Sequence, residues 1–318
     1  MPMNRIQFQR GMSLPEFLRC FGDELQCAEA VKQSRWPDGF RCPRCASATH
    51  YVVGHGARKL FQCCDCRHQS SLTAGTLFES TKLPLSTWFL AIYLLSQAKT
   101  GLSALALKRH LGVSYPTAWL MHQKIGHAMA QRERFHQLTG AVQLDDAYLG
   151  GERAGGKPGR GSENKVPFVA AVSLNAAGHP QYLKLSLVAG FTLEAISHWA
   201  KSALAPGACV RSDGLACFAA VTNAGCVHLP LVVGTLKPRE LPQFRWINTV
   251  LGNLKTTLSG THHSFNYNKY GATYLAAFAY RFNRRFDLTG LIARLIVDVV
   301  QCRPRQERVI RENAEVHC

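Results

Sequence analysis

No long apolar run occurs in this sequence of 318 residues. None of its segments approaches the roughly 20 apolar residues that a membrane-spanning helix needs. The opening residues, MPMNRIQFQRGMSLPEF, also lack the apolar stretch of about 7 to 15 residues found in a secretory signal. We therefore expect a cytoplasmic protein that does not enter a membrane.

Acidic residues are scarce as well. Aspartate and glutamate number 20 against 37 lysines and arginines, which gives a formal net charge of +17 and an isoelectric point near 9.6. The hydrophobic content of 47% excludes a disordered basic tail, because so many apolar residues can bury real cores. The length predicts about two domains with smaller appendages. The excess of positive charge indicates a nucleic-acid partner.

Twelve cysteines are present, and four of them have the spacing of metal ligands. In a reducing cytoplasm such spacing indicates metal ligation rather than disulfides. Cys42-x2-Cys45 and Cys63-x2-Cys66, separated by 17 residues, predict a zinc ribbon over residues 40–70 with one structural Zn²⁺. Zinc would then supply on the order of 10 kcal/mol of the folding free energy of this small segment. Ordinary buried cysteines, or a register that uses Cys64, are the alternatives.

Helical periodicity flanks this ribbon on both sides. Residues 1–39 form an N-terminal helical segment in which SLPEFLRCFGDELQCAEAVKQ is helical, and residues 71–138 form a helical region. In that region two helices meet at Gly112, with Ser114 as N-cap of the second, which is typical of a helix-turn-helix but also of any helical hairpin. The apolar positions that predict the hairpin are Leu105, Leu107, Leu111, Ala118, Met121 and Ile125.

Beyond residue 138 the pattern changes to short β-rich runs that alternate with helices. The strands AVQLDDAYLGG, VPFVAAVSL, QYLKLSLVA and CVRSD indicate an α/β domain over residues 139–300. Residues 301–318 then form a basic C-terminal tail. Between Arg281 and Arg311 there are eight arginines and no lysine.

Two carboxylates follow apolar strands of this domain. Asp145 and Asp213 each stand at the end of a strand, and such strand-end acids often meet in α/β sheets. Adjacent carboxylates repel unless a cation lies between them, so the pattern predicts a site for a hard metal such as Mg²⁺. Farther along, Asn248 and Lys255 are seven residues apart and therefore project from one helix face, about 10.5 Å apart along its axis. Ile247, Leu251, Leu254 and Leu258 form the opposite, apolar stripe.

The motifs occur in an order that resembles one family. RWPDGFRCPRC, TAGTLFESTKLPL, WFLAIYLLSQAKTGLSA, LDDAYLGGE, RSDG, WINTVLGNLK, GTHH and YRFNRR together resemble the bacterial insertion-sequence transposases of the DDE class, particularly the ISXO-like group. The resemblance covers nearly the whole chain. It implies an α/β RNase H-like catalytic domain preceded by a small zinc ribbon and a helix-turn-helix region that binds DNA.

The resemblance also implies a catalytic set. Asp145, Asp213 and a third residue would hold two Mg²⁺ or Mn²⁺ ions, and matching E-x6-K of related transposases to N-x6-K places the third ligand at Asn248. Asparagine at this place is known in the group, although it replaces the usual glutamate. Lys255 would contact a phosphate near the scissile bond. Asp146 stands where the family usually has glutamate.

Two matters about the third ligand stay open at this point. Asparagine favours helix N-caps, so Asn248 could instead begin its helix. Asn253 and Glu240 are rival third ligands.

Basic side chains in three regions are candidates for DNA contacts. The helical hairpin offers Lys108, Arg109, His122 and Lys124, the glycine-rich loop between the first two strands offers Arg153, Lys157, Arg160 and Lys165, and the motif YRFNRR offers Arg281, Arg284 and Arg285. The loop could equally be a solvated hairpin, and the last three arginines could pair with acids on the sheet. Whether the ribbon touches DNA or only supports a neighbour is open too.

The predicted function is therefore a transposase. It would bind the terminal inverted repeats and target DNA, cleave strands by Mg-dependent hydrolysis and join the 3′-hydroxyl ends to target DNA. Synapsis of two ends predicts a homodimer or higher oligomer on DNA, associated with the bacterial nucleoid. A transposase-derived DNA-binding regulator that cuts weakly or not at all is the alternative. A recombinase with a Ser or Tyr nucleophile finds no supporting set around Ser212, Tyr148 or Tyr280.

Overall fold

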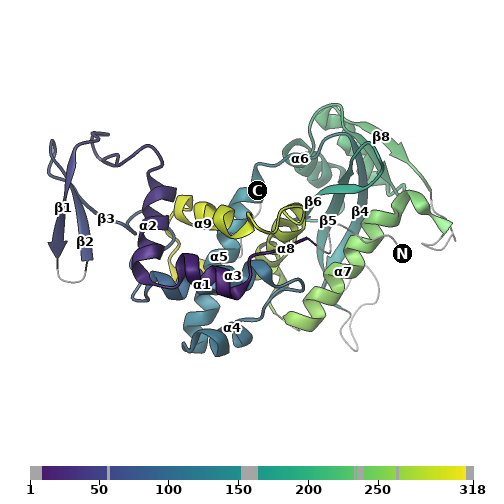
Figure 1. Ribbon diagram of the computed structural model, residues 1–318. Helices are drawn as coiled ribbons and strands as arrows, with labels where there is room; N and C mark the ends of the chain where they lie inside the picture. The colour runs from purple at the N-terminus through teal and green to yellow at the C-terminus, as the bar shows by residue number, and fades with distance from the viewer. Residues whose placement is uncertain are drawn as a thin grey trace. The chain divides into compact units, whose positions relative to one another are not determined.

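The computed structural model describes residues 9–55, 58–151, 164–232, 234, 240–262 and 265–312 (Figure 1). The chain divides into two compact units, Met1–Ala128 with Phe286–Arg311 (unit 1) and Met129–Arg285 with Glu312–Cys318 (unit 2). Within the described ranges no helix is long and apolar enough to cross a membrane. Of the predicted DNA contacts, Arg153, Lys157 and Arg160 lie outside the described residues.

Unit 1 combines helices with a small three-stranded sheet. Its helices are α1 (Leu14–Phe21), α2 (Glu24–Arg35), α3 (Leu85–Gln97), α4 (Ala104–Leu111), the larger part of α5 (Tyr115–Arg134), α9 (Leu291–Gln301) and most of α10 (Glu307–Glu312). Its sheet consists of β1 (His50–His55), β2 (Arg58–Cys63) and β3 (Gln69–Ser71), paired antiparallel in that order.

The N-terminal helical run is broken once. Helix α1 ends at Gly22, and Asp23 then caps α2 by accepting a hydrogen bond from the Gln26 amide at 2.8 Å. The Gln26 side chain accepts from the Asp23 amide in return, which completes a capping box. One predicted helical stretch is therefore two helices, because the reciprocal cap satisfies the amides that a new helix start exposes.

Helix α9 packs against α2 and α3. Its residues Leu291, Ile292, Leu295, Ile296 and Val299 are buried, so this C-terminal segment belongs to the core of unit 1. The pattern of the sequence predicts residues up to 300 in the α/β domain. The division into compact units does not follow that boundary.

The predicted helical hairpin is formed by α4 and α5. Gly112 ends α4 with a φ of 66°, a left-handed conformation that glycine adopts without strain. Ser114 accepts a hydrogen bond from the Thr117 amide at 3.3 Å and so caps α5 as expected. The buried predicted positions are Leu107, Ala118, Met121 and Ile125, whereas Leu105 is exposed.

Unit 2 is built on a five-stranded mixed sheet in the order β6-β5-β4-β7-β8. The strands are β4 (Ala141–Leu149), β5 (Val166–Leu174), β6 (Pro180–Leu187), β7 (Cys209–Ser212) and β8 (Val227–Pro230). The first three form an antiparallel meander, and β7 and β8 add to the free edge of β4 in parallel. Parallel addition requires crossovers, which α6 (Leu193–Ala203) and the 3-10 helix η2 (Ala216–Ala224) supply.

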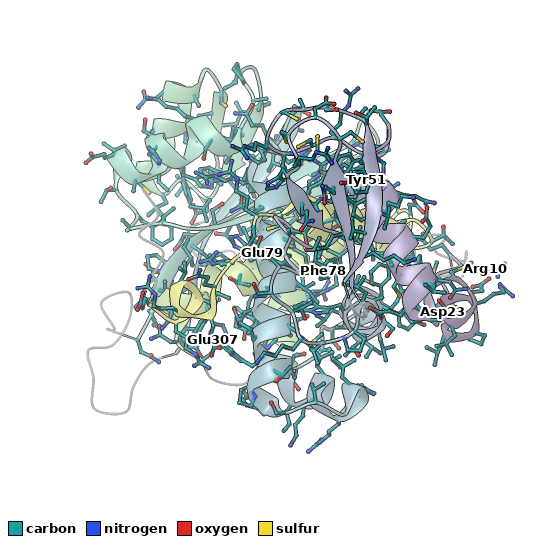
Figure 2. All side chains as sticks on the ribbon, turned by 90° about the vertical axis from the view of Figure 1, so that its left-hand side faces the viewer. Arg10, Asp23, Tyr51, Phe78, Glu79 and Glu307 are labelled. Carbon is teal, nitrogen blue, oxygen red and sulfur yellow. The ribbon has the colours of Figure 1, made fainter. Side chains whose placement is uncertain are left out.

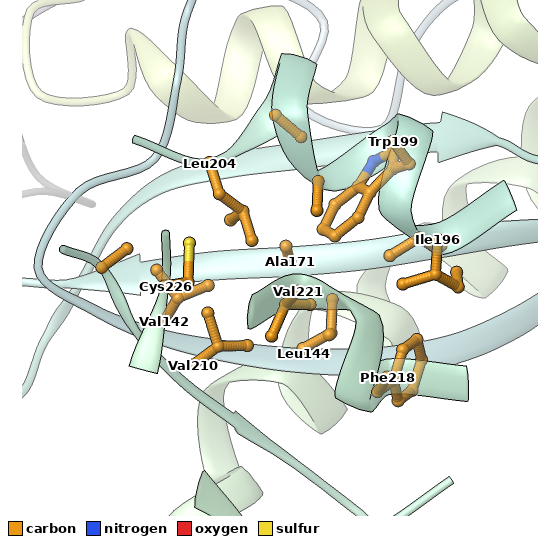
Figure 3. Close-up of a cluster of buried hydrophobic side chains, with 14 of the residues drawn as sticks. Val142, Leu144, Ala171, Ile196, Trp199, Leu204, Val210, Phe218, Val221 and Cys226 are labelled. Carbon is orange, nitrogen blue, oxygen red and sulfur yellow. The ribbon is translucent and has the colours of Figure 1, made fainter. Parts of the chain in front are cut away.

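The two faces of this sheet bury separate cores. On one face, Val142, Leu144 and Val210 pack with Trp199 of α6 and Phe218 of η2 (Figure 3). On the other face, side chains of β4 and β5 pack with α7 (Arg245–Thr261) and α8 (Tyr267–Asn283). Residues alternate between the faces along each strand. This alternation decides on which side each polar residue of β4 emerges.

Helix α7 is fixed to the sheet at its first turn. The side-chain oxygen of Gln143 accepts a hydrogen bond from the amide of Ile247 at 3.0 Å, and both residues are buried. The predicted apolar stripe is confirmed, because Ile247, Leu251 and Leu254 are buried in the core between α7 and the sheet. The opposite face of α7 is thereby directed away from the core.

Candidate functional site

The four predicted zinc ligands come together in unit 1. Their sulfur atoms lie within 4.8 Å of one another, with Cys42 to Cys66 and Cys45 to Cys63 both at 3.5 Å. Tetrahedral Zn–S bonds of about 2.3 Å require sulfurs roughly 3.8 Å apart, so the cluster fits a zinc ion. Cys64 is exposed and outside the cluster, which excludes the register that would have used it.

The backbone around these thiols favours their charged form. The amide of Cys66 donates to the Cys63 thiol and lowers its pKa to about 6, against the effect of burial. The amide of Arg44 lies 3.4 Å from the Cys42 sulfur and donates to it. Thiolates are the form that binds zinc, so the two knuckles are arranged for ligation before any ion is present.

In unit 2 three carboxylates form a second cluster. Asp145 and Asp146 on β4 and Asp213, directly after β7, have carboxylate oxygens within 4.8 Å of one another. The sequence analysis paired Asp145 with Asp213 as expected from strand ends that meet. It assigned no metal-binding role to Asp146, although the adjacency of two acids was the available signal.

The position of Asp145 differs from the expectation. It lies in the middle of β4, opposite Ala170 of β5, rather than at the end of the strand. The pairing of β4 with β7 stops earlier, at Gln143 opposite Arg211. Beyond that point the free edge of β4 faces the residue that follows β7. The carboxylates therefore meet where the pairing of β4 with β7 ends. On its other edge β4 stays paired with β5.

Alternation along β4 places Asp145 on the same face as Gln143, the face that α7 covers. Asp145 is half-buried there, and burial together with the negative charges of Asp146 and Asp213 raises its pKa to about 7, while Lys255 acts in the opposite direction. A carboxyl group in this position loses its proton reluctantly unless a cation is present. The donor set and its excess of negative charge thus fit a divalent metal ion.

Asp213 is held by its own turn. One of its carboxylate oxygens accepts a hydrogen bond from the Leu215 amide at 3.1 Å, and Gly214 takes a φ of 88°. The preceding Ser212 is fully buried, and its hydroxyl lies 2.9 Å from Nε2 of His228 on β8. Sequence reasoning gave no role to His228, because only the parallel pairing of β7 with β8 brings the two residues together.

Asn248 is not a helix cap. The N-cap position of α7 is Phe244, so Asn248 lies inside the second turn and is half-buried. Lys255 is exposed on the same face, and its charge acts on Asp145. The rival Asn253 lies five residues after Asn248, which turns it about 140° around the helix. Glu240 precedes α7 and is exposed.

The basic residues of the helical hairpin divide into exposed and buried ones. Lys108 and Arg109 are exposed in the last turn of α4. Lys124 is half-buried on α5, where burial lowers its pKa. His122 is buried and its Nε2 lies 3.0 Å from the carbonyl oxygen of Leu102, which corrects the expectation that it reaches phosphate.

The arginines of YRFNRR make contacts inside unit 2. Arg284 forms an ion pair with Glu133 at 2.5 Å and stacks over the Tyr280 ring. Arg285 donates to the carbonyl oxygens of Gln181 and Phe282, and burial lowers its pKa to about 10. Both guanidinium groups therefore make internal contacts, Arg284 with an acid of α5 rather than the acid on the sheet that the sequence had suggested, and Arg285 with backbone carbonyl oxygens.

The other two described basic candidates of unit 2 are half-buried. Burial also lowers the pKa of Arg281 to about 10. Lys165 is half-buried just before β5.

Comparison with known proteins agrees with this arrangement. Residues 137–283, which contain the whole sheet and the three carboxylates, match the family model for the ISXO2-like transposase domain. Most of unit 2 is thus similar to an ISXO2-like transposase domain. Residues 22–69 match the transposase zinc-ribbon domain, and this match contains all four clustered cysteines. The resemblance read from the sequence is confirmed, and zinc ribbon, transposase domain and mixed α/β sheet follow in the predicted order.

One relative extends the comparison. An uncharacterized protein in transposable element ISH50 of Halobacterium salinarum is 31% identical over 135 residues. The match covers 42% of this chain and 44% of the relative, less than half of either length. It therefore supports the transposase domain assignment without extending it to the whole chain.

Proposed function

We propose that this protein is a transposase that cuts DNA at the ends of an insertion sequence and joins those ends to target DNA. The observation that supports it most is the cluster of Asp145, Asp146 and Asp213 at the parting of β4 and β7 within a transposase domain. We assign unit 2 to the RNase H-like fold that the resemblance implies, and its mixed sheet, a meander extended by two parallel strands, supports this assignment.

We assign Asp145, Asp213 and Asn248 to the binding of divalent metal, preferably Mg²⁺ or Mn²⁺, and Asp146 is near enough to assist. Two such ions, when bound, would activate an attacking oxygen and stabilise a leaving one. Asn248, half-buried at the flank of the apolar stripe of α7, would supply a neutral oxygen to this site. Lys255, nearly two helical turns farther along the same side of α7, would hold a phosphate of the cleaved strand in register.

The proposed reaction has two steps, hydrolysis and then strand transfer. In the first, the oxygen of water forms a bond to phosphorus at the element end, and the bond from phosphorus to the 3′ oxygen breaks, which frees a 3′-hydroxyl. In the second, that hydroxyl oxygen bonds to a target phosphorus and the target strand's own 3′ oxygen leaves. Each step exchanges one ester or hydrolyses one, so neither requires an external energy source.

We also assign a role in DNA binding to unit 1. Lys108 and Arg109 are exposed beside the hairpin of α4 and α5, where a helix-turn-helix would place its second helix in a major groove. Lys165 remains a candidate from unit 2. Synapsis of two ends would require a dimer or larger assembly on DNA.

The test is cleavage and strand transfer on a labelled duplex that carries the end of the element encoding this chain, with Mg²⁺. Wild-type protein should release a 3′-hydroxyl end, whereas Asp145→Ala and Asp213→Ala proteins should bind the duplex equally well and leave it uncut. Nicking by either variant would refute the assignment of the site. Binding without cleavage by all three proteins would favour the regulator.

A further inference from the structure

The outer face of the zinc ribbon carries a row of polar side chains across its three strands. Strand pairing sets Tyr51 of β1 opposite Gln62 of β2, and Gln62 opposite Gln69 of β3. Tyr51 is 41% exposed, Gln69 is exposed and Gln62 is half-buried. Figure 2 shows Tyr51 on this sheet. Polar side chains on an outer face do not stabilise a hydrophobic core. Their presence in one row therefore suggests a binding role.

The row is ordered by its own hydrogen bonds. Gln69 donates to the side-chain oxygen of Gln62 at 2.7 Å, and Gln62 donates in turn to the Tyr51 hydroxyl. Arg67, exposed in the second knuckle, donates to the same hydroxyl at 3.2 Å. A primary carboxamide has two N–H donors, and these bonds use one from each glutamine. Both amides are therefore held in a fixed orientation with hydrogen-bonding capacity to spare.

The opposite face of the ribbon anchors it. Phe61 packs with its ring centroid 4.8 Å from Trp36 and 6.0 Å from Phe40, and Arg35 ties the end of α2 to the carbonyl oxygens of Ser71 and Leu72, each at 2.7 Å. Since side chains alternate between the two faces of a strand, the Tyr51 row is directed away from this anchor. The ribbon thus has one attached face and one presented face.

The charge of the segment indicates what it would meet. Residues 40–70 include five arginines or lysines and one aspartate. Among the described side chains, Arg41, Arg44, Lys59 and Arg67 are exposed. Positive charge around a row of amides suits a duplex, because phosphates attract the cations while glutamine can pair with the N6 and N7 edge of adenine. A pair of antiparallel strands is also an element that fits a major groove.

We propose that the row of Tyr51, Gln62 and Gln69, with Arg67, reads base sequence in duplex DNA at the element end. The proposal rests on the proposed function for its DNA partner. Gln62 and Gln69 lie on neighbouring strands about 4.8 Å apart, a distance between one and two of the 3.4 Å steps that separate base pairs. The two amides would therefore contact adjacent base pairs, and Arg67 a flanking phosphate. The ribbon would add sequence discrimination to the affinity that positive charge supplies.

The experiment compares binding of full-length variants to two probes, a labelled duplex carrying the element end and a shuffled duplex of equal composition. Gln62→Ala with Gln69→Ala should raise the Kd for the end duplex tenfold or more and change the Kd for the shuffled duplex less than twofold. Arg67→Ala should raise the Kd for both duplexes by a similar factor. Gln33→Ala, which removes an exposed glutamine of α2 outside the row, is the matched control.

Zinc content and melting temperature establish that each variant is folded. An unchanged ratio of the two Kd values in the folded double glutamine variant would overturn the proposal. So would a variant that binds DNA normally but changes its sedimentation, because the row would then contact a protein. Cleavage of the end duplex by wild type is scored separately. Lost discrimination without any cleavage would therefore keep this inference and refute the catalytic one.

Discussion

At the scale of single residues, the structure concentrates negative charge on Asp145. Its carboxyl has an ordinary pKa of 3.8 that burial and two neighbouring aspartates raise to about 7. Between these values the folded state holds a proton that the unfolded state has lost, so folding stability should fall as the pH rises from about 4 to about 7. A proposed metal ligand is here also a source of instability in the metal-free protein.

Asp145→Asn should accordingly stabilise the metal-free protein at pH 8. Each pKa unit corresponds to about 1.4 kcal/mol, which sets an upper limit of about 4 kcal/mol for the gain. Thermal melting in EDTA should give a higher Tm for the variant at pH 8 and a smaller difference at pH 5. Adding Mg²⁺ should raise the Tm of wild type more than that of the variant. Equal melting of the two proteins at pH 8 would contradict the charge argument, and Asp38→Asn serves as a control outside the cluster.

A second residue-scale prediction concerns Asn248. Its alanine variant should lose at least tenfold in Mg²⁺-dependent cleavage, because the variant lacks the oxygen that we propose as a metal ligand, whereas Asn248→Glu should keep or increase the activity. Asn253→Ala, on another side of the same helix, should stay within twofold of wild type. Cleavage rates at saturating DNA measure all three. Loss in the Asn253 variant with full activity in the Asn248 variant would reverse the assignment.

At the scale of elements, the pairing of β7 with β8 joins a buried serine to a histidine. Ser212 is fully buried, so removing its histidine partner by His228→Ala should cost about 1 to 2 kcal/mol of folding stability, although the hydroxyl still accepts a hydrogen bond from the Gly214 amide at 3.4 Å. Urea unfolding gives the difference, and the double variant with Ser212→Ala should recover part of it. If the two single losses simply add, the hydrogen bond contributes little.

The ribbon gives a second element-scale prediction. A chelator that removes zinc should unfold residues 40–70 and leave the five-stranded sheet intact, because the ribbon has a small core of its own around Phe40 and Phe61. Hydrogen exchange read by mass spectrometry should show protection lost in β1 and β2 but kept in β4 and β5. Unchanged protection in the ribbon after complete zinc removal would mean that its aromatic core suffices.

Local patterns predicted most of the elements and the sites, and missed what depends on pairing between distant segments. Thiol spacing predicted the four cysteines that cluster in the structure, because a zinc ribbon brings its ligands together within a short stretch. The seven-residue interval from Asn248 to Lys255 likewise predicted that both side chains lie on one helix face, because helix geometry is local in sequence. The middle position of Asp145, the partnership of Ser212 with His228 and the internal bonds of Arg284 all depend on strand register or tertiary packing. No single stretch of sequence predicts these long-range contacts.

At the scale of the whole molecule, the charge of +17 governs affinity for DNA. A protein that neutralises 6 to 10 phosphates should lose about 10³ to 10⁵ in affinity between 50 and 200 mM salt. We expect a loss of this size for a shuffled duplex with the full-length protein. Fluorescence anisotropy at several salt concentrations measures the slope, and a flat profile would argue against an electrostatic interface.

The geometry of helix α7 limits which mutations the gene can accept between Asn248 and Lys255. Asn248 and Lys255 share a face because seven residues complete nearly two turns, and Leu251 and Leu254 between them hold the helix to the sheet. Replacing an exposed residue in this interval keeps the phase, whereas inserting one residue turns Lys255 by about 100° and moves it off that face. The interval should therefore accept substitutions at its exposed positions and reject any change in its length.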